Sequence, residues 1–214
     1  IFWKESGKML AAMYLFQKGT PFIYQGQEIG MVNWRPESVE QYRDVQTIWN
    51  YNHTALNKTE EQRLKRQWRS ARDSARTPVQ WSAEKNAGFS DADTPWIDVN
   101  PNYTWLNAAQ QEEDPDSILN FYRKAVKLRK GLSCVRHGEY REHFPASNKL
   151  YMYSMEDSAQ KILVVCSFHE KEMMHRFPQG WDMSRAKLIL CNYSNPMSKV
   201  LRPYECKVYL WKKN

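Results

Sequence analysis

The hydrophobic period of this chain of 214 residues changes near residue 132, and that change constrains the fold more than any other feature. Before it, apolar side chains recur at helical spacing. After it, short apolar segments alternate with Gly, Pro, Asn and Asp. Evenly spaced segments of this kind predict the strands of an antiparallel β-sandwich. We expect a domain boundary near residues 131–134 and strands at 150–155, 161–168, 187–193 and 206–211.

The first part of the chain shows the alternation of helix and strand that builds α/β folds. Residues 6–18 repeat apolar side chains about every 3.6 positions, and Gly19 stands where a C-terminal cap belongs. The next apolar run, 21–24, is short and aromatic and is bounded by turn residues. Its length and composition predict a buried strand.

Two further helices are predicted at 37–51 and 59–69, and a capping-box pattern at 59–62 opens the second. Because both lie between a strand and the next long helix, we expect them to form an insertion above the sheet. The ends of that long helix are marked by three residues: Asp114 as N-cap, Pro115 as first residue and Gly131 as C-terminal cap.

The net charge of +7 is weak support for a nucleic-acid or membrane surface, because 31 basic and 24 acidic residues are interspersed. No apolar stretch approaches the ~18–20 residues of a membrane span. We therefore expect neither partner. The chain begins at Ile1 without an initiator Met or a signal peptide, which predicts a piece of a longer protein.

The four cysteines follow no metal-ligand spacing, and the histidines form no metal motif. Cys166 and Cys191 sit inside apolar runs, as small buried hydrophobes do. A reducing, cytoplasmic setting is the simpler expectation, with two disulfides as the alternative. We expect no metal and no cofactor.

The stretch 72–81 combines two arginines, an acid, a proline and an indole within ten residues. Arginine offers a planar fork of donors, and an adjacent Asp can orient that fork or accept hydroxyl hydrogens. Arg72, Asp73 and Trp81 therefore form a candidate sugar site. The alternative is a structural turn capped by a buried Trp.

The basic run 63–72 supports a second hypothesis, in which Trp68 stacks on a base and arginines contact phosphates. An amphipathic helix with a solvated charged face explains the same run. The nucleic-acid hypothesis also leaves the long aromatic loop beyond residue 76 without a role.

Hydrolysis of a glycoside needs two carboxylates that flank the scissile bond. The acids that could serve are few, and no second acid shares an element with the first of them. A complete catalytic set is therefore not apparent in the chain. The candidates are Glu28, Asp73, Asp91, Asp93 and Asp98.

Several separated motifs follow one another in an order that a known family shares. Residues 19–31 (GTPFIYQGQEIGM) carry the first, and residues 72–81 (RDSARTPVQW) match R-D-x-x-R-T-P-M-Q-W with Val79 for the usual Met. Further matches lie at 86–89, 95–103 and 201–210. Together they resemble glycoside hydrolase family 13, the α-amylase superfamily, and especially its oligo-1,6-glucosidase and α-glucosidase group.

The resemblance implies an α/β part followed by an all-β part. Residues 1–131 would be the C-terminal portion of a (β/α)8 TIM barrel, comprising helix 7, strand 8, an insertion and helix 8. Residues 132–214 would be an antiparallel β-sandwich domain. The family's nucleophile, acid/base and third carboxylate lie on strands 4, 5 and 7, so no catalytic residue is expected in this chain. The calcium-binding loops of the family would also be absent.

The resemblance further implies that Arg72 reaches the glucose unit beside the scissile bond, with Asp73 next to it, while Arg76 holds the loop. The expected substrate is a maltose- or isomaltose-type oligosaccharide, and the expected partner is the missing N-terminal barrel portion. A glucosyl isomerase or transferase of the same family (sucrose isomerase, trehalose synthase) is one alternative. A non-catalytic carbohydrate-binding or scaffold protein is another.

Overall fold

The computed structural model describes residues 2–213, which divide into two compact units. Residues 2–23 and 116–213 form the first, which we call the sheet unit, and Tyr24–Pro115 form the second, the loop unit. None of the helices within 2–213 has the length and apolarity needed to span a membrane. The domain boundary expected near 131–134 falls inside the sheet unit and stays a prediction.

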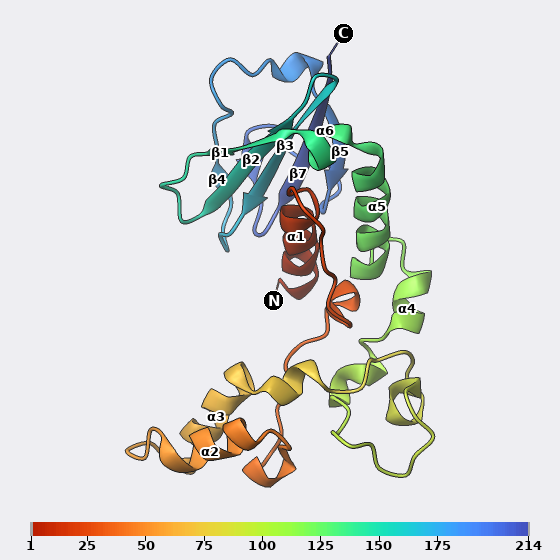
Figure 1. The fold of residues 1–214 in the computed structure, drawn as a ribbon, viewed down its shortest axis with the longest axis vertical. Coiled ribbons are helices and arrows are strands. Elements are labelled where there is room, and N and C mark those ends of the chain that lie inside the picture. Colours follow the sequence, from red (N-terminus) through yellow and green to blue (C-terminus); the bar gives the residue numbers. More distant parts are fainter. Residues whose placement is uncertain (1, 214) are drawn as a thin grey trace. The chain divides into compact units, whose positions relative to one another are not determined.

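A five-stranded antiparallel sheet lies at the centre of the sheet unit (Figure 1). Its strand order is β1-β2-β3-β7-β5, and a separate antiparallel pair joins β4 to β6. The four predicted strands are confirmed as β2, β3, β5 and β7. The strands are β1 (Glu139–His143), β2 (Leu150–Glu156), β3 (Gln160–Ser167), β4 (Met173–Met174), β5 (Lys187–Cys191), β6 (Val200–Leu201) and β7 (Cys206–Lys212).

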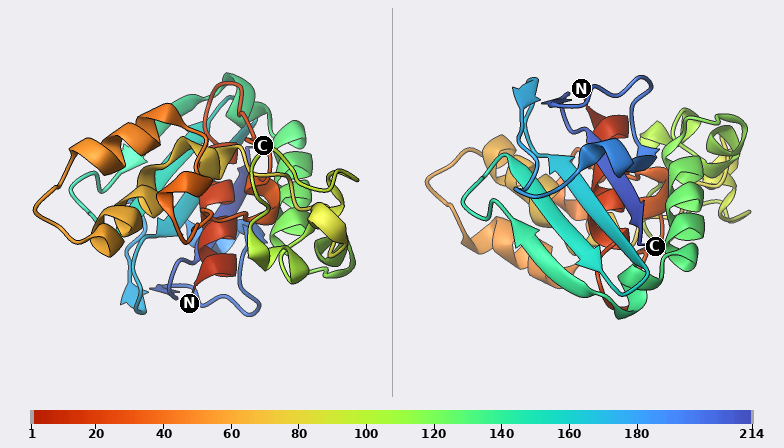
Figure 2. Two further views of the ribbon diagram at one scale, coloured as in Figure 1. Left: turned by 90° about the horizontal axis from the view of Figure 1, so that it is seen from below. Right: turned by 90° about the horizontal axis from the view of Figure 1, so that it is seen from above.

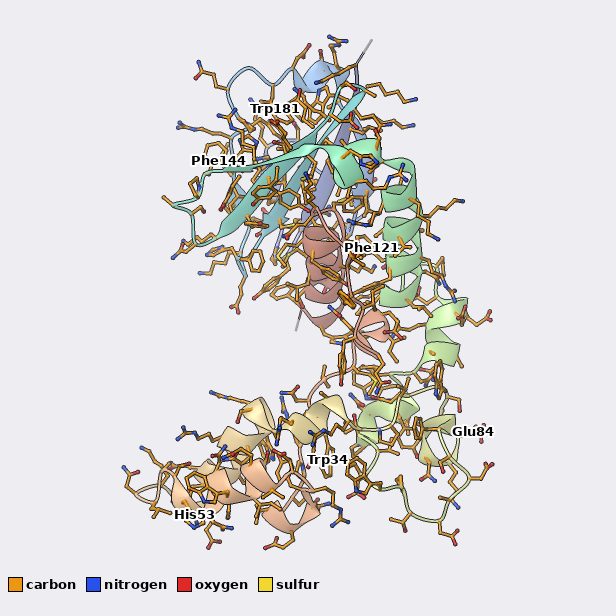
Figure 3. All side chains as sticks on the ribbon, viewed as in Figure 1. Trp34, His53, Glu84, Phe121, Phe144 and Trp181 are labelled. Carbon is orange, nitrogen blue, oxygen red and sulfur yellow. The ribbon has the colours of Figure 1, made fainter. Side chains whose placement is uncertain are left out.

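Both faces of this sheet are buried, which explains why its central strands are almost continuously apolar. Along β3, Ile162 and Val164 enter a core shared with helices α1 (Trp3–Leu15) and α5 (Ile118–Gly131). Phe121 of α5, which is labelled in Figure 3, belongs to this core. Leu163 and Val165 enter a second core, on the other side. Figures 1 and 2 show α1 and α5 side by side in this unit. The antiparallel sheet is confirmed, and its assignment to a β-sandwich domain stays a prediction.

The first predicted helix is confirmed, although α1 (Trp3–Leu15) begins and ends earlier than expected. Gly19 therefore does not cap it. Instead, the guanidinium of Arg129 in α5 (Ile118–Gly131) donates to the carbonyl oxygens of Leu15, Gln17 and Gly19. These donations satisfy the last carbonyl of α1 and two carbonyls of the chain that follows it.

The predicted start of the long helix at Asp114 is wrong. A short helix, α4 (Ala108–Glu113), ends there, and Ser117 is the N-cap of α5. The Ser117 hydroxyl accepts a hydrogen bond from the Asn120 N–H at 3.0 Å. Pro115 restricts the residue before it to extended backbone, so Asp114 ends one helix rather than beginning the next.

The strand predicted at 21–24 is also not formed, since the structure assigns no strand to these residues. A strand requires a hydrogen-bonded neighbour, and none of the described strands pairs with this segment. Its side chains are correspondingly open, with Phe22 exposed by 85% and Tyr24 by 59%. Residues 21–24 thus have the local sequence pattern of a strand, but they have no neighbouring strand to pair with.

The loop unit is built from helices and long connections around a small core that contains Tyr42 and Trp34. Trp34 is labelled in Figure 3. The capping box is confirmed, because Thr59 Oγ1 accepts from the Gln62 N–H at 3.2 Å. The helix predicted at 37–51 is helical only in part, since α2 begins at Val45 after a separate turn. The remaining helical segments are α2 (Val45–His53), α3 (Glu60–Ser70), α6 (Ser133–His137) and 3-10 turns at Gln27–Ile29, Val39–Gln41, Arg72–Ala75, Lys85–Gly88, Pro101–Thr104 and Met183–Arg185.

His175 gives the sheet unit an expected pH dependence. Its side chain is only 6% exposed, and burial lowers the pKa of the imidazole. The unfolded chain then binds a proton more readily than the folded one, so stability is lost as pH falls below about 6.5. We expect the free energy of unfolding in urea to decrease between about pH 7 and about pH 5.5. In His175→Gln this decrease should be smaller. An unchanged decrease would mean that other groups carry it.

Candidate functional site

Arg72 and Asp73 of the stretch 72–81 lie on a 3-10 turn that directly follows α3, and Arg76 comes immediately after that turn. Ala71 ends α3 with extended backbone, and Arg72–Ala75 then form the turn. Successive side chains of this turn face different surroundings. The Arg72 side chain is 62% exposed, whereas Asp73 is completely buried.

Arg72 is held by a carboxylate from a distant part of the chain. Its Nε and Nη2 donate to Oδ1 of Asp44 at 3.0 and 2.5 Å. Burial alone would raise the pKa of the Asp44 carboxyl, but hydrogen bonds from Arg72 and Thr47 outweigh it and hold the pKa below its usual range. The pKa of Arg72 is raised by the same contact. The pair is therefore fully charged at neutral pH.

Asp73 accepts its hydrogen bonds inside the loop unit. Its Oδ2 accepts from the backbone N–H groups of Arg43 and Asp44 at 2.7 and 2.9 Å. Its Oδ1 accepts from Arg76 Nη1 at 3.3 Å. Asp73 thus holds the chain that precedes α2. Of the two residues predicted to bind substrate, Arg72 is open to a ligand and Asp73 lies beneath it.

The rest of the stretch is mostly internal. Arg76 bridges Asp73 and Asp44, its Nη1 lying 3.7 Å from Asp44 Oδ1, which agrees with a role in holding the loop. Gln80 is completely buried and donates to the Leu106 carbonyl at 2.7 Å. Trp81, by contrast, is 53% exposed. It therefore does not act as the buried cap that the structural alternative requires.

A pocket of about 360 Å³ lies beside this turn, between residues 24–33 and 69–77 of the loop unit. Tyr24 Oη donates to the Ala75 carbonyl at 3.0 Å, and Asn33 Nδ2 donates to the Trp68 carbonyl at 2.9 Å, so the two segments are tied together. The hydroxyl and amide groups that line the pocket, together with the guanidinium of Arg69, suit a hydroxylated ligand. Local sequence patterns do not reveal it. Its lining includes Tyr24, Gln25, Gln27, Asn33, Arg69, Ser74 and Thr77.

The other predicted carboxylates lie on separate segments of the loop unit. Glu28 lies on the 3-10 turn Gln27–Ile29, between two glycines in the left-handed region. Asp93 pairs with Lys85 at 3.2 Å, and Asp98 accepts from Gln41 at 3.2 Å.

All four cysteines are free thiols. Across residues 2–213, no cluster of three or more His, Cys, Asp or Glu side chains is arranged to hold a metal ion.

Comparison with known protein families identifies the class to which this fold and loop belong. The family model described as the alpha amylase catalytic domain matches residues 2–138. That match covers most of the chain, and the chain therefore belongs to the alpha-amylase family.

Curated relatives are similar along nearly the whole chain. A probable oligo-1,6-glucosidase from Bacillus subtilis is 42% identical over 212 residues, which are 97% of this chain and 38% of the relative. An oligo-1,6-glucosidase from Halalkalibacterium halodurans is 40% identical over 214 residues, with the same shares. The chain thus spans little more than a third of the length of these relatives.

Two solved structures are also similar to nearly the whole of this chain. The trehalose-6-phosphate hydrolase of Bacillus licheniformis matches with a TM-score of 0.93 and 36% identity, over 99% of this chain and 39% of that one. The isomaltulose synthase of Protaminobacter rubrum matches with a TM-score of 0.86 and 34% identity, over 97% and 38%. Both a hydrolase and a synthase therefore share this part of the fold.

Proposed function

We propose that this chain is the C-terminal portion of a retaining α-glucosidase that removes terminal glucose from short oligosaccharides with α-1,4 or α-1,6 bonds. The similarity to oligo-1,6-glucosidases at about 40% identity supports this proposal. A retaining enzyme uses a carboxylate nucleophile and forms a covalent glycosyl intermediate, which water then hydrolyses. The nucleophile and the other catalytic carboxylates would belong to the part of the enzyme that precedes this chain.

In the proposed architecture, residues 1–131 complete a (β/α)8 barrel. Helix α1 would be barrel helix 7, the segment 21–24 strand 8, and α5 helix 8. Tyr24–Pro115 would carry the insertion between them, and residues 132–214 would be the β-sandwich domain. The exposed Phe22 and Tyr24 support this view, since strand 8 of a barrel needs neighbours on both sides.

Arg72 is the residue that we propose to contact the glucose unit beside the scissile bond. The observation that carries this role is its exposed guanidinium, of which only two N–H groups are used by Asp44. A guanidinium has five N–H groups, so three stay available for hydroxyl oxygens of a sugar. Asp73 would support the site from beneath through the backbone of Arg43 and Asp44.

A glucosyl isomerase or transferase is the second candidate, because the isomaltulose synthase shares the fold with a TM-score of 0.86. Product analysis separates the two. At high concentrations of maltose or sucrose, a hydrolase releases mainly free glucose. An isomerase or transferase accumulates new disaccharides or longer oligosaccharides.

The proposal is tested by comparing residues 1–214 with the full-length polypeptide that contains them. We expect the full-length protein to hydrolyse p-nitrophenyl α-glucoside and the 214-residue chain to show no turnover. Turnover by the chain alone would mean that it carries its own catalytic acids. A full-length protein that binds maltose without cleaving it would instead support a carbohydrate-binding or scaffold role.

A further inference from the structure

Asp44 connects two structural elements with its two carboxylate oxygens. Its Oδ2 is the N-cap acceptor of α2, since it accepts from the Thr47 N–H at 3.0 Å and from the Thr47 hydroxyl at 2.7 Å. Its Oδ1 accepts both donors of the Arg72 fork. Asp44 is 4% exposed. One buried carboxylate therefore fixes the start of α2 and the orientation of Arg72.

The charge of Asp44 is favoured by its surroundings. The N-terminus of a helix carries partial positive charge, and Arg72 supplies a full positive charge. The carboxyl pKa is lowered despite burial, so the residue stays ionised well below neutral pH. Charge-assisted hydrogen bonds to such a partner are roughly twice as strong as neutral ones.

The turn that carries Arg72 also binds the backbone of Asp44. Asp73, the residue after Arg72, accepts from the backbone N–H of Asp44 at 2.9 Å. Side chain and backbone of Asp44 are thus both bound to the turn that carries Arg72. The guanidinium consequently has one preferred orientation before any ligand arrives, and a ligand need not pay for that ordering.

We propose that Asp44 is the positioning residue for Arg72, so that the strength of the glucose contact depends on a carboxylate that does not touch the sugar. The inference rests on the proposed function, because it requires Arg72 to contact substrate. Its expected signature is a loss of kcat/KM when Asp44 is changed, and that loss should disappear when Arg72 is absent.

The test uses the full-length enzyme with p-nitrophenyl α-glucoside and four variants: Asp44→Asn, Arg72→Ala, their combination and Gln46→Ala. Asparagine caps helices as well as aspartate does, so Asp44→Asn retains α2 but removes the charge. We expect it to lower kcat/KM by about fivefold, and to have no further effect in the Arg72→Ala background. Gln46 is exposed in the first turn of α2 and donates a hydrogen bond to Asn50. Gln46→Ala should therefore have the same kcat/KM as the parent enzyme.

The outcomes separate the two proposals. If Arg72→Ala lowers kcat/KM and Asp44→Asn does not, positioning by Asp44 is refuted while the role of Arg72 stands. Equal losses from Asp44→Asn in both backgrounds would indicate a general structural effect and also refute it. If Arg72→Ala has no effect, the substrate contact itself fails, and the positioning role fails with it.

Arg72→Lys provides a test that leaves Asp44 intact. Lysine retains the positive charge, but its single ammonium cannot reproduce the two-donor fork that Asp44 grips. We expect a loss of kcat/KM comparable to that of Asp44→Asn. Full activity in Arg72→Lys would show that a positioned fork is not required.

Discussion

Replacing Arg72 with alanine in the full-length enzyme is expected to lower kcat/KM for p-nitrophenyl α-glucoside by at least about tenfold. The change removes a charged donor that is 62% exposed and already oriented by Asp44. It also leaves Asp44 buried without its main counter-charge. Initial rates over a range of substrate concentrations give kcat and KM separately. A loss confined to KM would mean that Arg72 holds substrate and transition state equally.

Arg66 offers a matched control for this prediction. It is an exposed arginine on α3 of the same unit, six positions before Arg72. Arg66→Ala removes the same charge without touching the turn 72–75, and should leave kcat/KM unchanged. Equal losses in the two variants would point to net charge, and an unchanged value in Arg72→Ala would assign that residue a structural role.

The elements that sequence patterns predicted well are those whose signals are local. The capping box of Thr59 and Gln62 forms because both partners lie within one helical turn. The strands around Leu163 and Val208 are predictable because burial on both faces leaves an almost continuous apolar run. The failures have the opposite character. Residues 21–24 have a strand pattern, but a strand exists only when a neighbour pairs with it.

The candidate site shows the same division. Arg72 could be selected because it belongs to a distinctive local combination of residues that also matches a motif of the family. Its partner could not, because Asp44 lies 28 positions away and comes beside Arg72 only in the folded loop unit. Asp44 does directly precede α2, and an Asp in that position is a recognisable N-cap signal. That signal predicts that Asp44 caps α2, but it does not predict that the other carboxylate oxygen of Asp44 accepts from Arg72.

Replacing Asp73 with alanine is expected to lower the free energy of unfolding of the loop unit by about 3 kcal/mol. The carboxylate is completely buried and accepts from two backbone N–H groups and from Arg76. Its removal leaves the N–H groups of Arg43 and Asp44 without an acceptor, and each such loss costs about 1–3 kcal/mol. Urea denaturation followed by tryptophan fluorescence measures the change, since the core of this unit contains Trp34.

Asp93→Ala is the matched control, because Asp93 is a fully exposed aspartate of the same unit whose partner Lys85 lies 3.2 Å away. Exposed ion pairs contribute little to stability, so this variant should lose only a small fraction of what Asp73→Ala loses. Similar losses would show that burial of Asp73 is not what matters. If Asp73→Ala proves as stable as the parent protein, the buried carboxylate does not hold this unit together, and its structural role must be revised.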